Sequence, residues 1–218
     1  LIREAAEIPG DFMIRVGMMN PSTLRPIAGE MVSAMAHEKI FSFLHVPVQS
    51  GSDTVLERMN RRYTVSEFEG ILEIFRSEIP DIRISTDYIV GFPGETENEF
   101  ADTVKLAKRS RITKVNITRY SEREGTASAE MRDMPDWIKK ERSRELNRVV
   151  MAVYDREYEP LIGTEMDVIV TGTKRSGSVV ARSGNYLDII IKKELPIGFR
   201  GKVRITANKQ VYLIADPV

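Results

Sequence analysis

The chain has 218 residues, 42% of them hydrophobic, and its 32 basic side chains balance its 32 acidic ones. No apolar run approaches the roughly 18 residues that a membrane span needs. The absence of cysteine excludes disulfides, thiolate metal ligands and a cysteine nucleophile within the chain, and it favours a cytoplasmic protein. The N-terminus has no signal-peptide pattern and no initiator methionine, so we expect the chain to begin inside a longer protein.

Strand and helix patterns alternate through the first 160 residues. The expected strands cover 12–17, 40–48, 82–90 and 114–119, and the expected helices begin near Pro21, Asp53, Thr64, Thr96 and Asp136. Two helix starts are capping boxes, Thr64 with Glu67 and Thr96 with Glu99. Asp136 is expected to cap a long helix to Tyr158 that has Trp137 on its inner side. This alternation favours a parallel sheet with right-handed crossovers, either a barrel or a doubly wound sheet.

The pattern changes near residue 160. Five short strands are expected at 166–171, 178–182, 186–191, 201–206 and 210–215. Their spacing suits a small five-stranded barrel of the OB sort, so we expect domains at 1–159 and 160–218. Between Met166 and Ala215 nine basic residues meet three acidic ones, a net charge of +6 that leaves −6 for the remainder. This positive charge could serve only to keep the surface soluble. Alternatively, it indicates that the second domain binds an anionic partner.

Two dense loop motifs follow the strands at 40–48 and 82–90. The first runs from His45 to Ser52 with the pattern H-x-P-x-Q-S-G-S, and the second runs from Asp87 through Gly91 to Thr96. The carboxyl ends of parallel strands are where ligands bind in β/α proteins. Gln49 offers donors and acceptors there, and Gly51 would let a ligand approach the backbone. A lone strand histidine such as His45 is more often structural than a base.

These motifs support a resemblance to a known family. The segments HVPVQSGSDTVLERMNRRYT and STDYIVGFPGETENEF resemble the radical S-adenosylmethionine (SAM) tRNA methylthiotransferases. The turn at 16–21 is similar to the third barrel strand of the archaeal and eukaryotic-type branch, which acts on threonylcarbamoyladenosine. Residues 120–127 resemble the sixth-strand loop, although Glu122 and Ser128 stand where proline is common. The basic five-stranded segment resembles the family's RNA-binding TRAM domain.

The resemblance implies an α/β fold: a partial (β/α) TIM-like radical SAM barrel followed by a small all-β OB-like TRAM barrel. In the family, a [4Fe–4S] cluster reduces SAM to a 5′-deoxyadenosyl radical, which abstracts hydrogen from C2 of a modified adenosine before a methylthio group is installed. The implied SAM contacts are Gln49, Ser50, Asp87, Ile89 and Gly91, with Asn116 and Ile117 flanking the adenine and Arg15 touching SAM or substrate.

The cluster-binding cysteines of the family are absent from this chain, so we expect a C-terminal portion of the enzyme that is inactive alone. The implied partners are the tRNA anticodon region and an electron donor for the cluster. We also expect a possible homodimer through the barrel edge at 12–17, because an open strand edge invites pairing.

The expected RNA contacts are basic residues of the second domain, which bind phosphates by charge. They are Lys174, Arg175, Arg182, Lys192, Lys193, Arg200, Lys202 and Arg204. Tyr186, Phe199 and Tyr212 would either stack on bases or pack in the core. Alternative interpretations are an RNA-binding module with a purely structural half-barrel, a methylthiotransferase acting on isopentenyladenosine or a ribosomal protein, and a TIM-type enzyme using Asp87 and Glu95.

Overall fold

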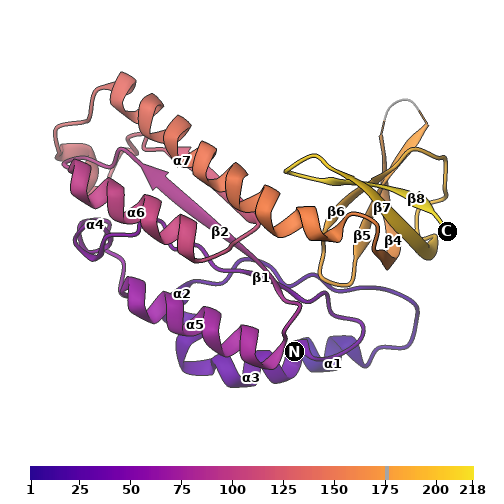
Figure 1. The fold of residues 1–218 in the computed structure, drawn as a ribbon. Helices are drawn as coiled ribbons and strands as arrows, with labels where there is room; N and C mark the ends of the chain where they lie inside the picture. Colours follow the sequence, from indigo (N-terminus) through magenta and orange to yellow (C-terminus); the bar gives the residue numbers. More distant parts are fainter. Residues whose placement is uncertain (175–176) are drawn as a thin grey trace.

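A computed structural model describes residues 1–174 and 177–218 as an α/β half joined by a long helix to an all-β barrel (Figure 1). The elements of the first half are α1 (Ile2–Ala6), α2 (Pro21–Leu24), η1 (Arg25–Ile27), α3 (Ala28–Met35), β1 (Phe43–His45), α4 (Asp53–Arg58), α5 (Val65–Glu78), β2 (Arg83–Val90), α6 (Glu97–Arg109), β3 (Lys114–Arg119), η2 (Ala127–Glu130) and α7 (Asp136–Tyr158). Those of the second half are η3 (Glu159–Leu161), β4 (Glu165–Lys174), β5 (Ser178–Ser183), β6 (Asp188–Ile191), β7 (Arg200–Asn208) and β8 (Leu213–Pro217).

The sheet of the first half is parallel, with the order β1-β2-β3, which confirms the expected topology. β1 is shorter than the expected strand at 40–48. Pro47 has no N–H to donate, and Gln49 takes a left-handed conformation with φ of 70°. Pairing resumes at Gln49, whose N–H donates to Asp87 O at 2.8 Å and whose carbonyl accepts from Ile89 N at 2.8 Å. The chain therefore stays beside β2 beyond His45, in a broken ladder.

The expected strand at 12–17 forms only isolated bridges beside β1. Ile14 pairs with Ile40 and Met18 with His45, both in parallel. Between these bridges the guanidinium of Arg15 lies over the ring of Phe43, 5.5 Å from its centroid. The segment is extended and lies next to β1, but it is not a regular strand. Dimer formation along this edge stays a prediction.

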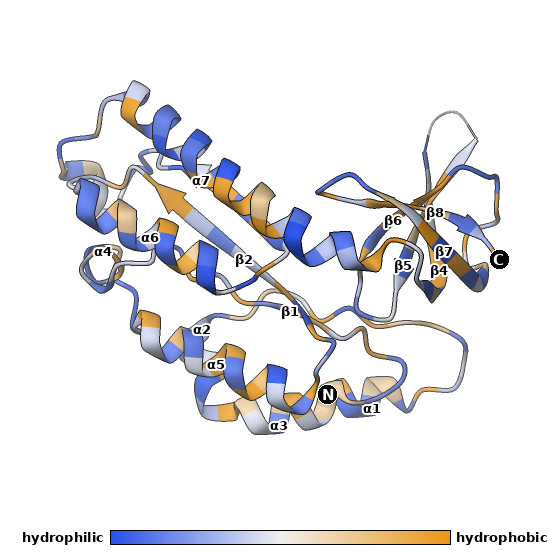
Figure 2. Ribbon diagram, in the orientation of Figure 1, coloured by the Kyte–Doolittle hydropathy of each residue, from blue (hydrophilic) through white to orange (hydrophobic). Residues whose placement is uncertain are grey.

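Helices with one buried face cover the sheet, as their blue and orange bands indicate (Figure 2). Both expected capping boxes are present, Thr64 with Glu67 and Thr96 with Glu99. The apolar stripe of α5 lies in the core with Phe68 and Phe75 fully buried. None of the helices in the described ranges is long and apolar enough to cross a membrane.

The start of α7 differs from the expectation in two respects. Pro135 is the N-cap residue and Asp136 lies inside the first turn, where it pairs with Arg119 and Lys140. Trp137 is 66% exposed, because the buried face of α7 runs instead through Leu146, Val150 and Val153. That face begins with two charged residues, Lys139 and Arg142.

The second half is a closed barrel with the strand order β4-β5-β6-β8-β7. β6 and β8 pair in parallel, and the other neighbours are antiparallel. Five strands and an OB-like barrel were expected, and both are confirmed. The third strand begins at Asp188 rather than 186, because Tyr186 lies in a turn with φ of 63°.

Candidate functional site

Three side chains from neighbouring strands meet on one face of the sheet. Asp87 on β2 lies opposite Asn116 on β3 in the register. Asn116 Nδ2 donates to Asp87 Oδ1 at 2.6 Å, and His45 Nε2 on β1 lies 3.1 Å from Asp87 Oδ2. Because alternate strand residues point to opposite faces, this triad and Ile89 share the face that the helices leave uncovered. The structure therefore brings together His45, Asp87 and Asn116.

The triad keeps Asp87 ionised. Burial alone would disfavour the charge, but hydrogen bonds from His45 and Asn116 outweigh it and hold the pKa of the Asp87 carboxyl below its ordinary value. A charged Asp87 can accept hydrogen bonds but cannot donate one. The triad thus presents a fixed acceptor, with His45 in a structural and electrostatic role.

Gln49 lies at the end of this edge, opposite Tyr88 in the register. It is 9% exposed, and its side-chain amide has no hydrogen-bond partner among the described residues. Its backbone φ of 70° is uncommon for a residue other than glycine and is costly to maintain. An amide that still reaches solvent, on a residue held in a strained conformation at the carboxyl end of a strand, is suited to bind a ligand group in a fixed orientation.

A buried ion pair between Arg142 and Glu95 holds the loop after β2 in place. Arg142 of α7 donates to Glu95 Oε2 at 2.6 Å, and Glu95 Oε2 also accepts from Gly91 N at 2.8 Å. Gly91 has φ of 72°, and a Cβ there would lie 2.4 Å from Cγ of Lys139. Since the Glu95 side chain is 0% exposed, it cannot serve as an acid in a cleft. This excludes the enzyme interpretation that paired it with Asp87.

Ser50 and Gly51 serve the packing of α6. The Ser50 hydroxyl is fully buried and lies 3.3 Å from the hydroxyl of Thr103. A Cβ on Gly51 would lie 2.5 Å from Thr103 Cα and 2.6 Å from Asp102 O. The space beside Gly51 is therefore filled by helix backbone, which corrects our expectation that a ligand approaches there. A SAM contact by Ser50 stays a prediction.

The remaining expected cofactor contacts lie apart from one another. Ile117 lies opposite Tyr88 in the register and packs against the helix-covered core, so its side chain is on the face opposite Asn116. Arg15 lies over Phe43 and Tyr186, toward the second domain. Ile89 is half-buried on the open face. The contacts of Arg15, Ile89 and Ile117 with SAM or substrate stay predictions.

A cavity of about 550 Å³ lies over the carboxyl end of β3 and contains a residue that the sequence analysis missed. Lys139 is 6% exposed and donates to Asp133 Oδ2 at 2.6 Å and to Tyr120 O at 3.3 Å. The hydroxyl of Tyr120 is buried without a partner among the described residues. No sequence signal identifies Lys139, because a lysine at the start of a polar helix normally faces water.

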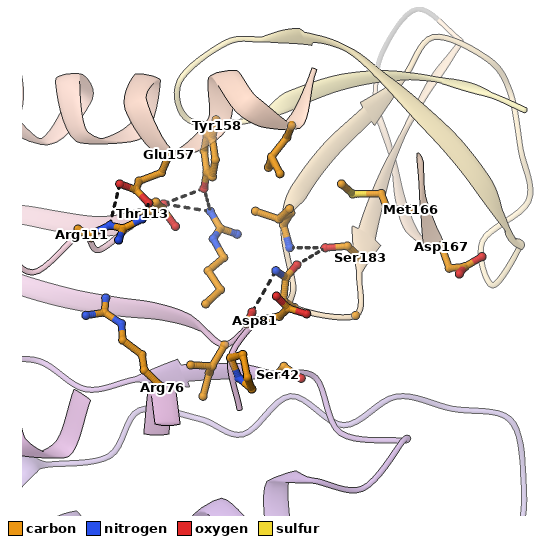
Figure 3. Close-up of a pocket in the computed structure, with 17 residues that line it drawn as sticks. Ser42, Arg76, Asp81, Arg111, Thr113, Glu157, Tyr158, Met166, Asp167 and Ser183 are labelled. Atoms are coloured by element: carbon orange, nitrogen blue, oxygen red, sulfur yellow. Dashed lines mark hydrogen bonds and ion pairs between the residues drawn. The ribbon is translucent and has the colours of Figure 1, made fainter. Parts of the chain in front are cut away.

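A second cavity, of about 820 Å³, lies at the opposite ends of the strands (Figure 3). Arg83 and Thr113, at the amino ends of β2 and β3, contribute to its lining, together with Ser183 and Asn185 from the second half. It therefore lies between the two halves of the molecule and is distinct from the loop edge that contains Gln49.

The predicted RNA contacts fall into two groups. Lys192 and Lys193 are exposed without an ion pair in the described part of the chain, and Lys174 Nζ lies 5.2 Å from the centroid of the Tyr212 ring. The others are paired: Arg182 with Asp188, Arg200 with Asp11, Lys202 with Asp167 and Arg204 with Glu165. Arg175 lies outside the described residues.

The three aromatic residues expected to stack on bases or pack in the core, Tyr186, Phe199 and Tyr212, differ in their exposure. Tyr186 packs between Phe41 and Phe43, with ring centroids 4.8 Å and 5.1 Å away. Phe199 is 37% exposed, and Tyr212 is half-buried beneath Lys174. Of the predicted RNA contacts in the described residues, Lys174, Lys192 and Lys193 are the exposed ones without an ion pair.

Comparisons with known proteins agree with this architecture. Residues 1–107 match the Radical SAM superfamily, and residues 160–218 match the TRAM domain. Coproporphyrinogen III oxidase from Escherichia coli, a radical SAM enzyme, has a similar fold with a TM-score of 0.52 at 18% identity. That similarity covers 81% of this chain and 46% of the oxidase, and at this identity it concerns the fold alone.

Sequence relatives cover nearly all of the chain. It is 42% identical over 219 residues to a probable threonylcarbamoyladenosine tRNA methylthiotransferase of Pyrococcus abyssi, which is 99% of this chain and 51% of that protein. The Pyrococcus horikoshii counterpart is 45% identical, with the same coverage. The human threonylcarbamoyladenosine tRNA methylthiotransferase is 34% identical over 90% of this chain and 33% of its own length. The chain thus spans about half the length of the archaeal relatives. Its two domains and this continuous similarity place it in the radical SAM family of threonylcarbamoyladenosine tRNA methylthiotransferases.

Proposed function

We propose that this chain is part of a threonylcarbamoyladenosine tRNA methylthiotransferase. Its first half would form one wall of the SAM-binding barrel, and its second half would be the TRAM domain. The activity of the whole protein is the addition of a methylthio group to C2 of the modified adenosine beside the anticodon. The relatives support the reaction, and the domain order supports the assignment of each half. We place the domain boundary between residues 159 and 160, where α7 ends and the TRAM match begins.

SAM would bind where the open face of the sheet meets the carboxyl ends of β1 and β2. Gln49 offers an unpaired amide, Asp87 a charged acceptor and Ile89 an apolar side chain, all at the carboxyl ends of β1 and β2. Amide and carboxylate groups suit the amino, hydroxyl and ring nitrogen atoms of an adenosyl group, and Ile89 suits its flat face. When bound, SAM supplies the radical chemistry of the superfamily, while this chain's residues bind and orient it.

An iron–sulfur cluster does not fit the residues present. Its ligands are thiolates, and the chain contains no cysteine. Groups of three or more candidate metal ligands are also absent from the described residues. In this proposal the cluster and the electron donor that reduces it are therefore bound by other parts of the protein.

The second domain would bind the tRNA. Lys192 and Lys193 are exposed and form no ion pair with the described residues, so their charge is available to phosphates. We propose that this surface binds near the anticodon region and that Arg182, Arg200 and Arg204 act mainly within the protein. An RNA-binding module without a cofactor is the second candidate, because the TRAM domain alone would give that activity.

The single observation that carries the cofactor proposal is the strained and unpaired Gln49. Titration calorimetry of this chain with SAM tests it. We expect Gln49→Ala to weaken binding about fivefold to tenfold, the effect of removing one hydrogen bond. Asn98→Ala, an exposed residue of α6, is the matched control and should bind like wild type. Equal affinities for Gln49→Ala and wild type would contradict the site, and tRNA binding without SAM binding would favour the second candidate.

A further inference from the structure

Arg83 joins the two halves of the molecule from the central strand. Its side chain is 3% exposed. It donates to Asp188 Oδ2 at 3.0 Å and to Tyr186 O at 2.6 Å in the second domain. It also donates to Thr113 O at 3.1 Å and to the Tyr158 hydroxyl at 2.8 Å in the first. One guanidinium therefore holds both domains.

Asp188 receives three cations from this interface. Besides Arg83, Lys114 Nζ lies 3.0 Å from Asp188 Oδ2, and Arg182 bonds to Asp188 Oδ1. Burial opposes the charge of Asp188, but Arg83, Lys114 and Arg182 together lower its pKa to about 2. Because one carboxylate faces three cations, its removal would leave like charges close together in a partly buried place.

The loop before Asp188 fits against the first domain. Ser42 N donates to Gly184 O at 2.9 Å, and Asn185 Nδ2 donates to Asp81 O at 3.2 Å. Tyr186, in its left-handed conformation, packs on Phe41 and Phe43. We call Arg83, Asp188 and the 183–187 loop the latch.

Beside the latch the domains are separated by the cavity of about 820 Å³ (Figure 3). Other ties are the part-buried hydrogen bonds from Asn208 and Gln210 to Asp155, the pair of the exposed Asp11 with Arg200, and a hydrophobic core that continues between the halves. The latch concentrates the polar contacts between the domains, so we infer that it contributes most to their relative orientation. Orientation matters because a base must reach the carboxyl ends of the strands while the TRAM surface binds the same RNA, and small misplacements at a reacting centre are costly.

We propose that Asp188 is a positioning residue that fixes the TRAM barrel on the sheet, so that bound tRNA presents its nucleoside to the SAM-binding edge. The proposal rests on the proposed function for its purpose, but the orientation itself can be measured without activity. Asp188 acts through Arg83 and touches neither cofactor nor RNA.

Pulsed electron–electron double resonance tests the orientation. The chain has no cysteine, so Glu73→Cys on α5 and Thr206→Cys on β7, both exposed, give two unique spin-label sites. We expect one narrow distance distribution in the wild-type background and a distribution at least about twofold broader in Asp188→Asn, because the amide leaves three cations unbalanced. A second variant, Tyr186→Ala, should broaden it as well. Narrow, unchanged distributions in both variants would overturn the proposal.

Two controls separate the latch from general destabilisation. Lys114→Gln removes one surplus cation and leaves Arg83 and Arg182 paired with Asp188, so the distribution should stay narrow. Asp216→Asn changes an exposed carboxylate on β8 and should also leave it narrow. Circular dichroism confirms that each variant is folded. Broadening in Asp216→Asn would mean that any loss of a carboxylate loosens the domains, which contradicts a specific role for Asp188.

Binding and coupling measurements distinguish this proposal from the proposed function. Asp188→Asn should bind tRNA within about twofold of wild type, because Lys192 and Lys193 are intact. In the full-length enzyme, Asp188→Asn should cleave about tenfold more SAM for each methylthio group transferred. A smaller fraction of folded enzyme would lower both rates equally and leave this ratio unchanged. An unchanged ratio would refute the positioning role, whereas absence of tRNA binding in wild type would refute the proposed function and leave the distance result standing.

Discussion

Asn116 on β3 donates a 2.6 Å hydrogen bond to Asp87 on the neighbouring strand β2, on the face of the sheet that the helices leave open. His45 bonds the other carboxylate oxygen from β1. One carboxylate therefore links all three strands of the sheet on its open face. The hydrogen bonds from Asn116 and His45 tie the three strands together, and the same bonds lower the pKa of Asp87 and fix its carboxylate.

Replacing Asn116 by alanine should raise the pKa of Asp87. The Asn116 hydrogen bond favours the ionised form, and without it the burial of Asp87, which opposes ionisation, is less well offset. The carboxyl carbon shift of Asp87, followed by NMR as a function of pH, measures the change. Asn98→Ala is the control, because Asn98 is exposed on α6. An Asp87 titration that is the same in Asn116→Ala and wild type would mean that the bond contributes nothing to the charge.

Alanine at Gly51 should destabilise the first domain by about 2 kcal/mol, because a Cβ there meets the backbone of α6 rather than a flexible side chain. Thermal unfolding followed by circular dichroism measures it. Gly70→Ala is the matched control: Gly70 lies in α5 with nothing within 4 Å of a new Cβ, so it should stabilise by about 0.5–1 kcal/mol. Unfolding of Gly51→Ala at or above the wild-type temperature would show that the loop can move away from α6.

The stability contributed by Asp188 should disappear in acid. Its pKa in the folded chain is about 2, below the ordinary value of 3.8. A carboxyl with a lowered folded pKa stabilises the fold above its unfolded pKa, and the contribution disappears as the pH falls through the folded pKa. The stability difference between wild type and Asp188→Asn should therefore be constant above about pH 5 and shrink toward pH 2. Urea unfolding across that range measures it, and a difference that does not vary with pH would contradict the ionised pairing.

Neutralising Lys192 and Lys193 should weaken tRNA binding and reduce its salt dependence. For each phosphate that a lysine no longer neutralises, the slope of log affinity against log salt should fall by roughly one. Filter binding at several salt concentrations compares Lys192→Gln/Lys193→Gln with Lys105→Gln/Lys108→Gln, two exposed lysines of α6. The α6 pair should behave like wild type. An equal decrease in affinity in both double variants would place the RNA elsewhere or show nonspecific charge effects.

The sequence was informative where local rules decide the structure. The two capping boxes, the parallel order and the five strands of the barrel follow from periodicity and from side chains near helix starts. The loop edge could be located because glycine, proline and polar residues cluster after buried strands. These features depend on neighbours in the chain and so are visible without the fold.

The errors concern contacts that only tertiary structure determines. Trp137 was placed inside by its apolarity, yet α7 buries Lys139 and Arg142 there, because Asp133 and Glu95 neutralise them. Arg182, which was expected among the RNA contacts, pairs with Asp188 on the neighbouring strand β6, and its contact with RNA stays a prediction. Lys139 and Arg182 each pair with a carboxylate six residues along the chain, and Arg142 pairs with Glu95, 47 residues away. None of these spacings is the i,i+3 or i,i+4 pattern by which a helix sequence reveals an ion pair.

The most direct test of the central claim is nucleoside mass spectrometry of tRNA modified in vitro. The first half of the Pyrococcus horikoshii relative, joined ahead of this chain and reconstituted anaerobically with iron and sulfide, would act on tRNA that contains threonylcarbamoyladenosine. We predict that a methylthio group replaces one hydrogen of that nucleoside and that the product falls strongly in Gln49→Ala. SAM cleavage with no methylthiolated threonylcarbamoyladenosine, or methylthio transfer to isopentenyladenosine instead, would contradict the proposed function.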